Sequence, residues 1–129
     1  MENSYGFGKA VSYSFEVALE KVTEALKNEG FGILTEIDAS ATIKKKLNID
    51  MLPYRILGAC NPTLAHKALE AEPSIGLLLP CNVVVRMENN KVFVEFMDPN
   101  ILMEIVNKPE IDTLAKEVRK RLQNVMDAI

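Results

Sequence analysis

The chain has 129 residues, of which 48% are hydrophobic and 26% are charged, and this composition excludes the disordered and collagen-like classes. Its formal net charge of -3 and its short apolar runs give no reason to expect nucleic acid or a membrane as a partner. The length fits one domain, residues 1–129, because no linker rich in Gly, Ser or Pro divides it. Two cysteines without an export signal are expected to be free thiols in the cytoplasm.

The chain opens with a predicted strand and a predicted helix. Residues Tyr5–Val11 are typical of a strand, and the hydroxyl of Ser12 or Ser14 offers a cap for the helix that follows. Gly30 is typical of the residue that closes such a helix. Apolar residues at helical spacing form the core-facing stripe of this helix: Phe15, Ala18, Leu19, Val22, Ala25 and Leu26.

A second strand and a short basic helix are predicted next. Phe31, Ile33 and Ile37 follow a nearly alternating pattern, which indicates a strand. The segment Ala39–Leu47 is predicted to be a helix. Its lysines, Lys44 to Lys46, are expected to face water because such charge runs usually lie on a solvated face.

The segment Tyr54–Cys60 is typical of a strand that leads directly into a helix. Asn61 supplies a helix cap and Pro62 a first-turn proline, while Pro73 limits the length of the helix. The pattern therefore places Cys60 at the last position of a strand, immediately before a helix N-terminus.

A β-hairpin is predicted over residues 81–97. Asn89-Asn90 suits its tight turn, because asparagine tolerates the positive φ that such turns demand. One face of this hairpin carries the polar residues Asn82, Arg86 and Glu95, and the other face is apolar. A two-residue turn predicts these cross-strand pairs on the apolar face: Met87 with Val92, Val85 with Val94, Val83 with Phe96, and Cys81 with Asp98.

Pro109 begins the longest predicted helix, and its apolar stripe continues to the end of the chain. The basic run Arg119-Lys120-Arg121 is expected to lie on the solvated face of this helix. The order of all these elements predicts an α+β fold in which a mainly antiparallel sheet has helices packed on one face.

Two Cys-Asn pairs, Cys60-Asn61 and Cys81-Asn82, are the most distinctive chemistry of the sequence. Cys60 is the candidate catalytic residue, because the unpaired N–H groups at a helix start favour a thiolate. The structural alternative is that Cys60 packs as a small buried hydrophobe, as free cysteines commonly do.

Cys81 is expected to be less activated than Cys60. Its apolar face and the neighbouring carboxylate of Asp98 both raise the pKa of a thiol. Asn61 has a structural role as a helix cap, whereas Asn82 lies on the polar face with donors that can orient a small ligand. The candidate ligand-binding residues are therefore Cys60, Asn61, Cys81 and Asn82.

His66 is the only histidine, and it lies away from the apolar stripe of its helix. To reach Cys60 it would have to fold back over the helix N-terminus, which disfavours a Cys-His couple. A metal held by Cys60 and Cys81, with His66 or a partner subunit, is a weaker alternative, because a 21-residue separation matches no compact metal-site spacing. No cofactor is predicted, because no Gly-rich phosphate loop of recognised spacing occurs.

The stretches 53–62 (PYRILGACNP) and 72–85 (EPSIGLLLPCNVVV) resemble the prokaryotic domain-of-unknown-function family 302. The resemblance implies a fold similar to one copy of the TATA-box-binding-protein-like unit, a curved antiparallel sheet backed by helices, and assembly as a homodimer. It implies neither DNA binding nor an activity. Cys60, Asn61, Cys81 and Asn82 are signature positions in this resemblance.

The sequence leaves three functional hypotheses open. The first is a small homodimeric binding or regulatory protein with a small-molecule ligand near the two Cys-Asn pairs, since no complete catalytic set is visible. The second is a thiol-dependent enzyme or redox protein that uses Cys60 as nucleophile and Cys81 as resolving thiol. The third is metal binding by Cys60 and Cys81.

Overall fold

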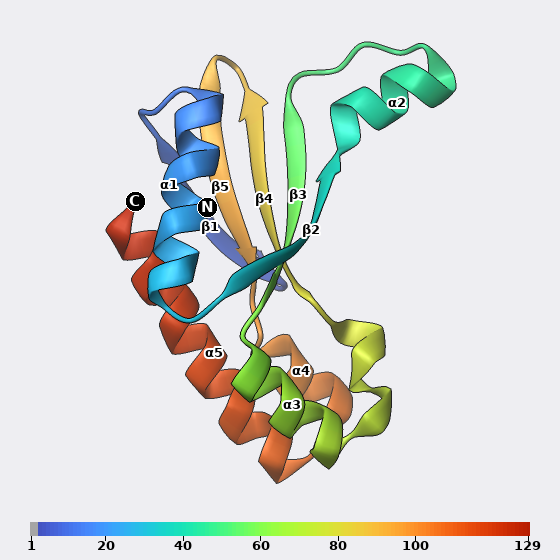
Figure 1. Ribbon diagram of the computed structural model, residues 1–129, viewed down its shortest axis with the longest axis vertical. Helices are drawn as coiled ribbons and strands as arrows, with labels where there is room; N and C mark the ends of the chain where they lie inside the picture. The colour runs from blue at the N-terminus through green and yellow to red at the C-terminus, as the bar shows by residue number, and fades with distance from the viewer. Residues whose placement is uncertain (1–2) are drawn as a thin grey trace.

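Five strands form an antiparallel sheet in the order β1-β5-β4-β3-β2 in the computed structural model, which describes residues 3–129 (Figure 1). The predicted α+β fold with an antiparallel sheet is therefore confirmed. The strands are β1 (Gly6–Val11), β2 (Gly32–Asp38), β3 (Tyr54–Cys60), β4 (Cys81–Glu88) and β5 (Lys91–Met97).

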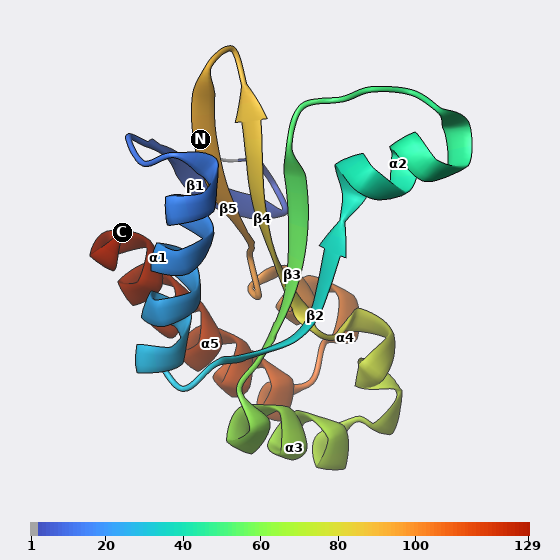
Figure 2. The ribbon, with the colours of Figure 1, turned by 45° about the horizontal axis from the view of Figure 1, so that its top comes forward.

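All the helices except the one over residues 39–47 form two groups, which Figures 1 and 2 show from two directions. Helix α1 (Phe15–Asn28) and the C-terminal half of α5 (Pro109–Ala128) cover one face of the sheet. Beyond one end of the sheet, α3 (Pro62–Ala71), the 3-10 helix η1 (Pro73–Leu78) and α4 (Ile101–Val106) gather near the N-terminal half of α5. Within residues 3–129, no helix combines the length and apolarity needed to cross a bilayer.

Helix α2 (Ala39–Leu47) connects β2 to β3 and projects from the edge of the sheet (Figures 1 and 2). None of its residues is buried. Its predicted bounds are confirmed, and Asp38 caps it by accepting a hydrogen bond from the Ala41 backbone N–H at 2.9 Å. This projecting segment, continued by residues 48–53, is called the α2 arm below.

Local sequence explains the boundaries of the other early elements. Of the two serines predicted as caps, Ser14 accepts a hydrogen bond from the Val17 backbone N–H at 3.2 Å and so begins α1. Gly30 follows this helix with a φ of 85°, a conformation that L side chains rarely adopt. The predicted turn residues Asn89 and Asn90 have φ values of 52° and 63°.

The hairpin of β4 and β5 has most of its predicted register, but Cys81 does not pair with Asp98. Cys81 instead opposes Ala59 of β3. Strand β5 ends at Met97, and the chain turns away where the Asn100 backbone N–H donates to Asp98 Oδ1 at 3.0 Å. The ladder therefore stops before Cys81, and the confirmed pairs on the apolar face are Val83 with Phe96, Val85 with Val94, and Met87 with Val92.

The basic run of α5 does not lie wholly on a solvated face, so that prediction is wrong for its two arginines. Only Lys120 is exposed. The Arg119 guanidinium carbon lies 3.6 Å from the centroid of the Phe7 ring, and Arg121 Nη1 donates to the Glu29 carbonyl oxygen at 3.1 Å. A planar guanidinium can stack on a ring and form several directed hydrogen bonds, so these side chains join α5 to β1 and to the end of α1.

The main hydrophobic core lies between the sheet and the pair α1 and α5. A second, smaller cluster joins η1, α4 and the start of α5 and consists of Ile75, Leu102 and Ile111. The main core contains fully buried residues from α1, β4, β5 and α5, among them Val22, Leu26, Val83, Val85, Val94, Phe96, Leu122 and Val125.

Replacing Leu26 by alanine is expected to lower the free energy of unfolding by about 2–5 kcal/mol, because a fully buried side chain leaves a cavity between α1 and the sheet. Leu77→Ala is the matched control. Leu77 is 88% exposed, so its loss should change stability by less than about 0.5 kcal/mol. Urea unfolding followed by circular dichroism measures both values, and equal losses would contradict this assignment of the core.

Candidate functional site

The junction of β3 and α3 brings Cys60 and Asn61 to the end of the sheet. Strand β3 ends at Cys60, and α3 begins at Pro62. Between them, Asn61 Oδ1 accepts a hydrogen bond from the Leu64 backbone N–H at 3.2 Å, which confirms the predicted cap. The Asn61 residue is only 8% exposed, so this hydrogen bond satisfies a helix N–H where water has little access.

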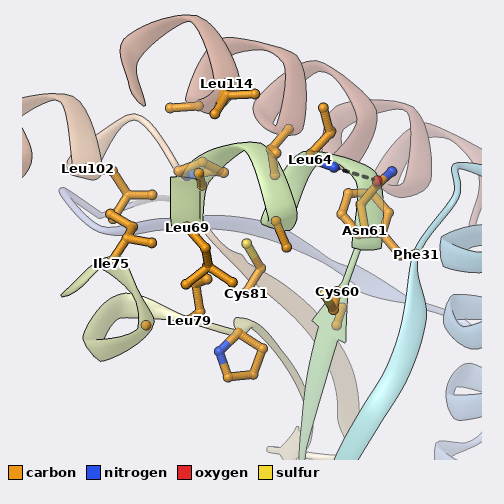
Figure 3. Close-up of a pocket in the computed structure, with 18 of the residues that line it drawn as sticks. Phe31, Cys60, Asn61, Leu64, Leu69, Ile75, Leu79, Cys81, Leu102 and Leu114 are labelled. Carbon is orange, nitrogen blue, oxygen red and sulfur yellow. Dashed lines mark hydrogen bonds between the residues drawn. The ribbon is translucent and has the colours of Figure 1, made fainter. Parts of the chain in front are cut away.

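An apolar cavity of about 360 Å³ lies beside this junction and is lined by residues of α3, η1, α4, α5 and the ends of β3 and β4 (Figure 3). Cys60, Asn61 and Cys81 all line it. Its volume falls within the usual range of small-molecule sites. The rest of its wall is mostly aliphatic and aromatic and includes Phe31, Leu64, Ala68, Ile75, Leu79, Leu102, Leu114 and Val118.

Both cysteines line this cavity because their strands, β3 and β4, are neighbours in the sheet. Cys81 opposes Ala59, the residue that precedes Cys60 in β3. Both cysteines are free thiols, as predicted. The distance between Cys60 and Cys81 cannot be predicted from the sequence alone, because the sequence does not determine that β3 lies beside β4.

Burial raises the pKa of both thiols. The pKa of Cys81 rises to about 11, first because the thiol is desolvated and second because Cys60 lies nearby. The predicted effect of the apolar surroundings is therefore confirmed, whereas Asp98 is not among the causes. Desolvation also raises the pKa of the half-buried Cys60. The structure thus gives no support to an activated Cys60 thiolate. The Leu64 N–H, which would favour such an anion at the helix start, is already bonded to Asn61 Oδ1.

Asn82 lies apart from the other three candidate ligand-binding residues. It opposes Gly58 on the face of the sheet that is opposite to Cys81, because successive side chains of a strand point to opposite faces. Its side chain belongs to a different hollow on that face, together with Tyr54, Val84, Arg86 and Glu95. The structure therefore brings together one complete Cys-Asn pair and only the cysteine of the second.

His66 is exposed, and its Nε2 lies 2.9 Å from Glu70 Oε1 on the next turn of α3. It is not among the residues that line the apolar cavity. Within the described residues 3–129, no group of three or more His, Cys, Asp and Glu side chains is arranged to hold a metal ion.

Sequence reasoning misses the wall that η1 and α4 contribute. Ile75, Gly76 and Leu79 line the cavity from the segment between α3 and β4, and Leu102 lines it from α4. The available signal was the apolar run 75–79, which fits neither a helical nor a strand period and directly precedes Pro80-Cys81.

Fold and site together define an α+β protein with an apolar cavity at the end of an antiparallel sheet, beside two neutral thiols. The chain belongs to the family described as "Domain of unknown function DUF302", whose model matches residues 7–129. It is similar to a solved structure, the "uncharacterized conserved protein DUF302 from Bacillus stearothermophilus", with 30% identity, 98% of each chain covered and a TM-score of 0.90. The comparison with curated proteins finds no match. The family predicted from residues 53–62 and 72–85 is confirmed.

Alkylation by iodoacetamide is expected to be slow at both thiols near neutral pH and faster at Cys60 than at the buried Cys81. The raised pKa values keep both groups protonated there, and the thiolate is the reactive form. Mass spectrometry of the modified peptides should show the Cys60 rate still rising above about pH 9. In urea the two rates should become equal. A Cys60 rate that levels off near neutral pH would favour the thiol-dependent hypothesis instead.

Proposed function

We propose that this protein is a small-molecule binding or regulatory protein whose ligand occupies the apolar cavity. The observation that carries the proposal is the cavity itself, about 360 Å³ in volume and bordered by Cys60, Asn61 and Cys81. Small-molecule sites are concave and mostly apolar, with volumes of roughly 300–1,000 Å³. A hollow of this size at the end of the sheet is therefore a distinct feature with room for a ligand.

The chemistry of the wall indicates an apolar ligand. Water in such a cavity finds few hydrogen-bond partners, so an apolar group that displaces it gains free energy, about 25 cal/mol for each Å² removed from water. The two thiols agree with this role. With raised pKa values both are neutral near pH 7, and a neutral cysteine behaves as a small hydrophobic residue.

The neighbouring positions of Cys60 and Cys81 also agree with the hypothesis of a redox pair. The direction of both pKa shifts opposes it, because a nucleophilic thiol needs a lowered pKa and both are raised. Ligand binding without thiol chemistry is therefore the function that this site supports best.

Filling the cavity should abolish binding of an apolar probe. Gly76 lines the cavity, and a Cβ built on it meets nothing within 4 Å, so Gly76→Leu should place its side chain in the hollow. Fluorescence of the neutral probe N-phenyl-1-naphthylamine should rise with wild-type protein and weaken at least about tenfold with this variant. Gly32→Leu is the matched control, because Gly32 also has space for a Cβ but does not line the cavity. Unchanged binding by Gly76→Leu would contradict the proposed site.

We further propose that the binding protein acts as a homodimer, the assembly that the family resemblance implies, through the α2 arm. The arm exposes several large apolar side chains, and an exposed apolar cluster commonly marks a surface for another protein. The arm is also basic. Lys44 is paired with Asp50 of the same arm at 2.9 Å, and Lys45 and Lys46 add positive charge to it, whereas the whole chain has a net charge of -3. A second copy offers an acidic complement in the exposed row Glu16, Glu20 and Glu24 of α1. The exposed apolar residues of the arm are Leu47, Ile49, Met51 and Leu52.

Light scattering after gel filtration is expected to give wild-type protein a mass of twice the 14.4 kDa of one chain. Ile49→Glu should shift the mass to that of one chain, because it places a charge within the apolar surface of the arm. Ile105→Glu is the matched control, since Ile105 is a similarly exposed isoleucine on α4. A wild-type mass of one chain would contradict the homodimer.

A further inference from the structure

The apolar cavity adjoins a second hollow of opposite character, the basic vestibule. The two share Asn61, Leu64 and Leu114, and Figure 3 shows these leucines on the facing helices α3 and α5. The charged side chains of the vestibule are Lys67, Lys116, Glu117, Lys120 and Arg121. Cations therefore outnumber carboxylates four to one here, although the chain as a whole is acidic. This local excess of positive charge attracts an anion.

Two hydrogen-bond donors converge where the vestibule meets the cavity. A Cβ built on Gly30 would lie 2.9 Å from Asn61 Nδ2 and 3.2 Å from Arg121 Nη1. Both nitrogens therefore pack closely against Gly30, which brings the two donors near each other and leaves no room for a side chain at this position. The Arg121 guanidinium donates to the Glu29 carbonyl oxygen and to Glu117 Oε1, at 3.1 and 3.3 Å, which fixes its position beside Gly30 and Asn61.

The Asn61 amide nitrogen has no hydrogen-bond partner among residues 3–129. Its residue is only 8% exposed, and the one hydrogen bond of its side chain is accepted by Oδ1 from Leu64. The nitrogen is not sealed from solvent, because Asp112 Oδ1 is the one fully buried and unpartnered side-chain N or O atom among residues 3–129. The Asn61 nitrogen keeps access from the vestibule that this residue lines, so an acceptor can reach it. This donor is independent of the surrounding lysines and points to an acceptor supplied by a ligand.

We propose that the site takes an organic acid with an apolar tail. The carboxylate lies in the basic vestibule against Asn61 Nδ2 and Arg121, and the tail passes Leu64 and Leu114 into the apolar cavity. A planar carboxylate offers two acceptor oxygens, which suits an amide donor beside a planar guanidinium. This inference rests on the proposed binding function and adds the charge and the orientation of the ligand.

Titration calorimetry with matched ligands tests the inference. Decanoate is expected to bind at least about tenfold more tightly than decanol, which has the same tail without the charge. From hexanoate through octanoate to decanoate, each added methylene should tighten binding about fourfold as more tail enters the cavity. Added salt should weaken binding of decanoate and leave decanol almost unchanged, because salt screens the vestibule.

Asn61→Asp separates the proposed donor from the helix cap. Aspartate keeps an oxygen that accepts from the Leu64 N–H and is as good a cap as asparagine, but it loses the Nδ2 donor and adds a negative charge. Decanoate affinity should fall at least about tenfold, whereas decanol affinity should hold. Asn90→Asp is the matched control, because it makes the same change in the exposed hairpin turn.

A second pair of variants tests the charge of the vestibule alone. Lys116 and Lys120 are exposed, so changing both to glutamine should leave the fold intact and weaken decanoate binding roughly fivefold. The same double change at Lys45 and Lys46 on the α2 arm removes equal charge at a distance and should have no effect.

The outcomes distinguish the two proposals. If neither decanoate nor decanol binds and the neutral probe also fails, the binding function itself is wrong. If decanol binds as tightly as decanoate and the vestibule variants change nothing, the binding function stands and the organic-acid inference is overturned.

Discussion

Helix α5 packs against the sheet with one half and against η1 and α4 with the other, and the position of the apolar cavity depends on this double packing. Its C-terminal half supplies Leu122 and Val125 to the core under the sheet, while its first turns supply Ile111 to the cluster with η1 and α4. Because one continuous helix belongs to both clusters, the distance between the sheet and the outlying helices is fixed. The apolar cavity is lined by residues of both α5 and α3, which lie side by side in Figure 3.

Asn61 links the stability of this region to its chemistry. Its oxygen caps α3, the residue lines both the cavity and the basic vestibule, and its amide nitrogen packs against Gly30. The thiols contribute in a different way. Burial raises the pKa of Cys60 and Cys81, so they extend the apolar wall instead of adding charge to it. The polar and apolar parts of the site therefore remain separate.

Local interactions made much of the fold predictable, and non-local ones account for the errors. The caps Ser14 and Asn61 and the turn Asn89-Asn90 follow from chemistry within a few residues. The predicted pairing of Cys81 with Asp98 failed because β5 ends earlier, and η1 and α4 are too short for a periodic pattern to reveal them. The solvated arginines failed because the stacking of Arg119 on Phe7 joins opposite ends of the chain.

The sequence by itself determined the five strands, the helices α1, α2, α3 and α5, the family, and the two Cys-Asn pairs as the positions of interest. Only the tertiary structure decided that the two cysteines line one cavity. The order β1-β5-β4-β3-β2 places β3 beside β4 and so brings Cys60 and Cys81 to one cavity, while strand alternation turns Asn82 to the opposite face. The vestibule likewise requires Gly30, Asn61 and Arg121 to meet from distant parts of the chain. Such contacts arise from burial of the whole core, which no local pattern encodes.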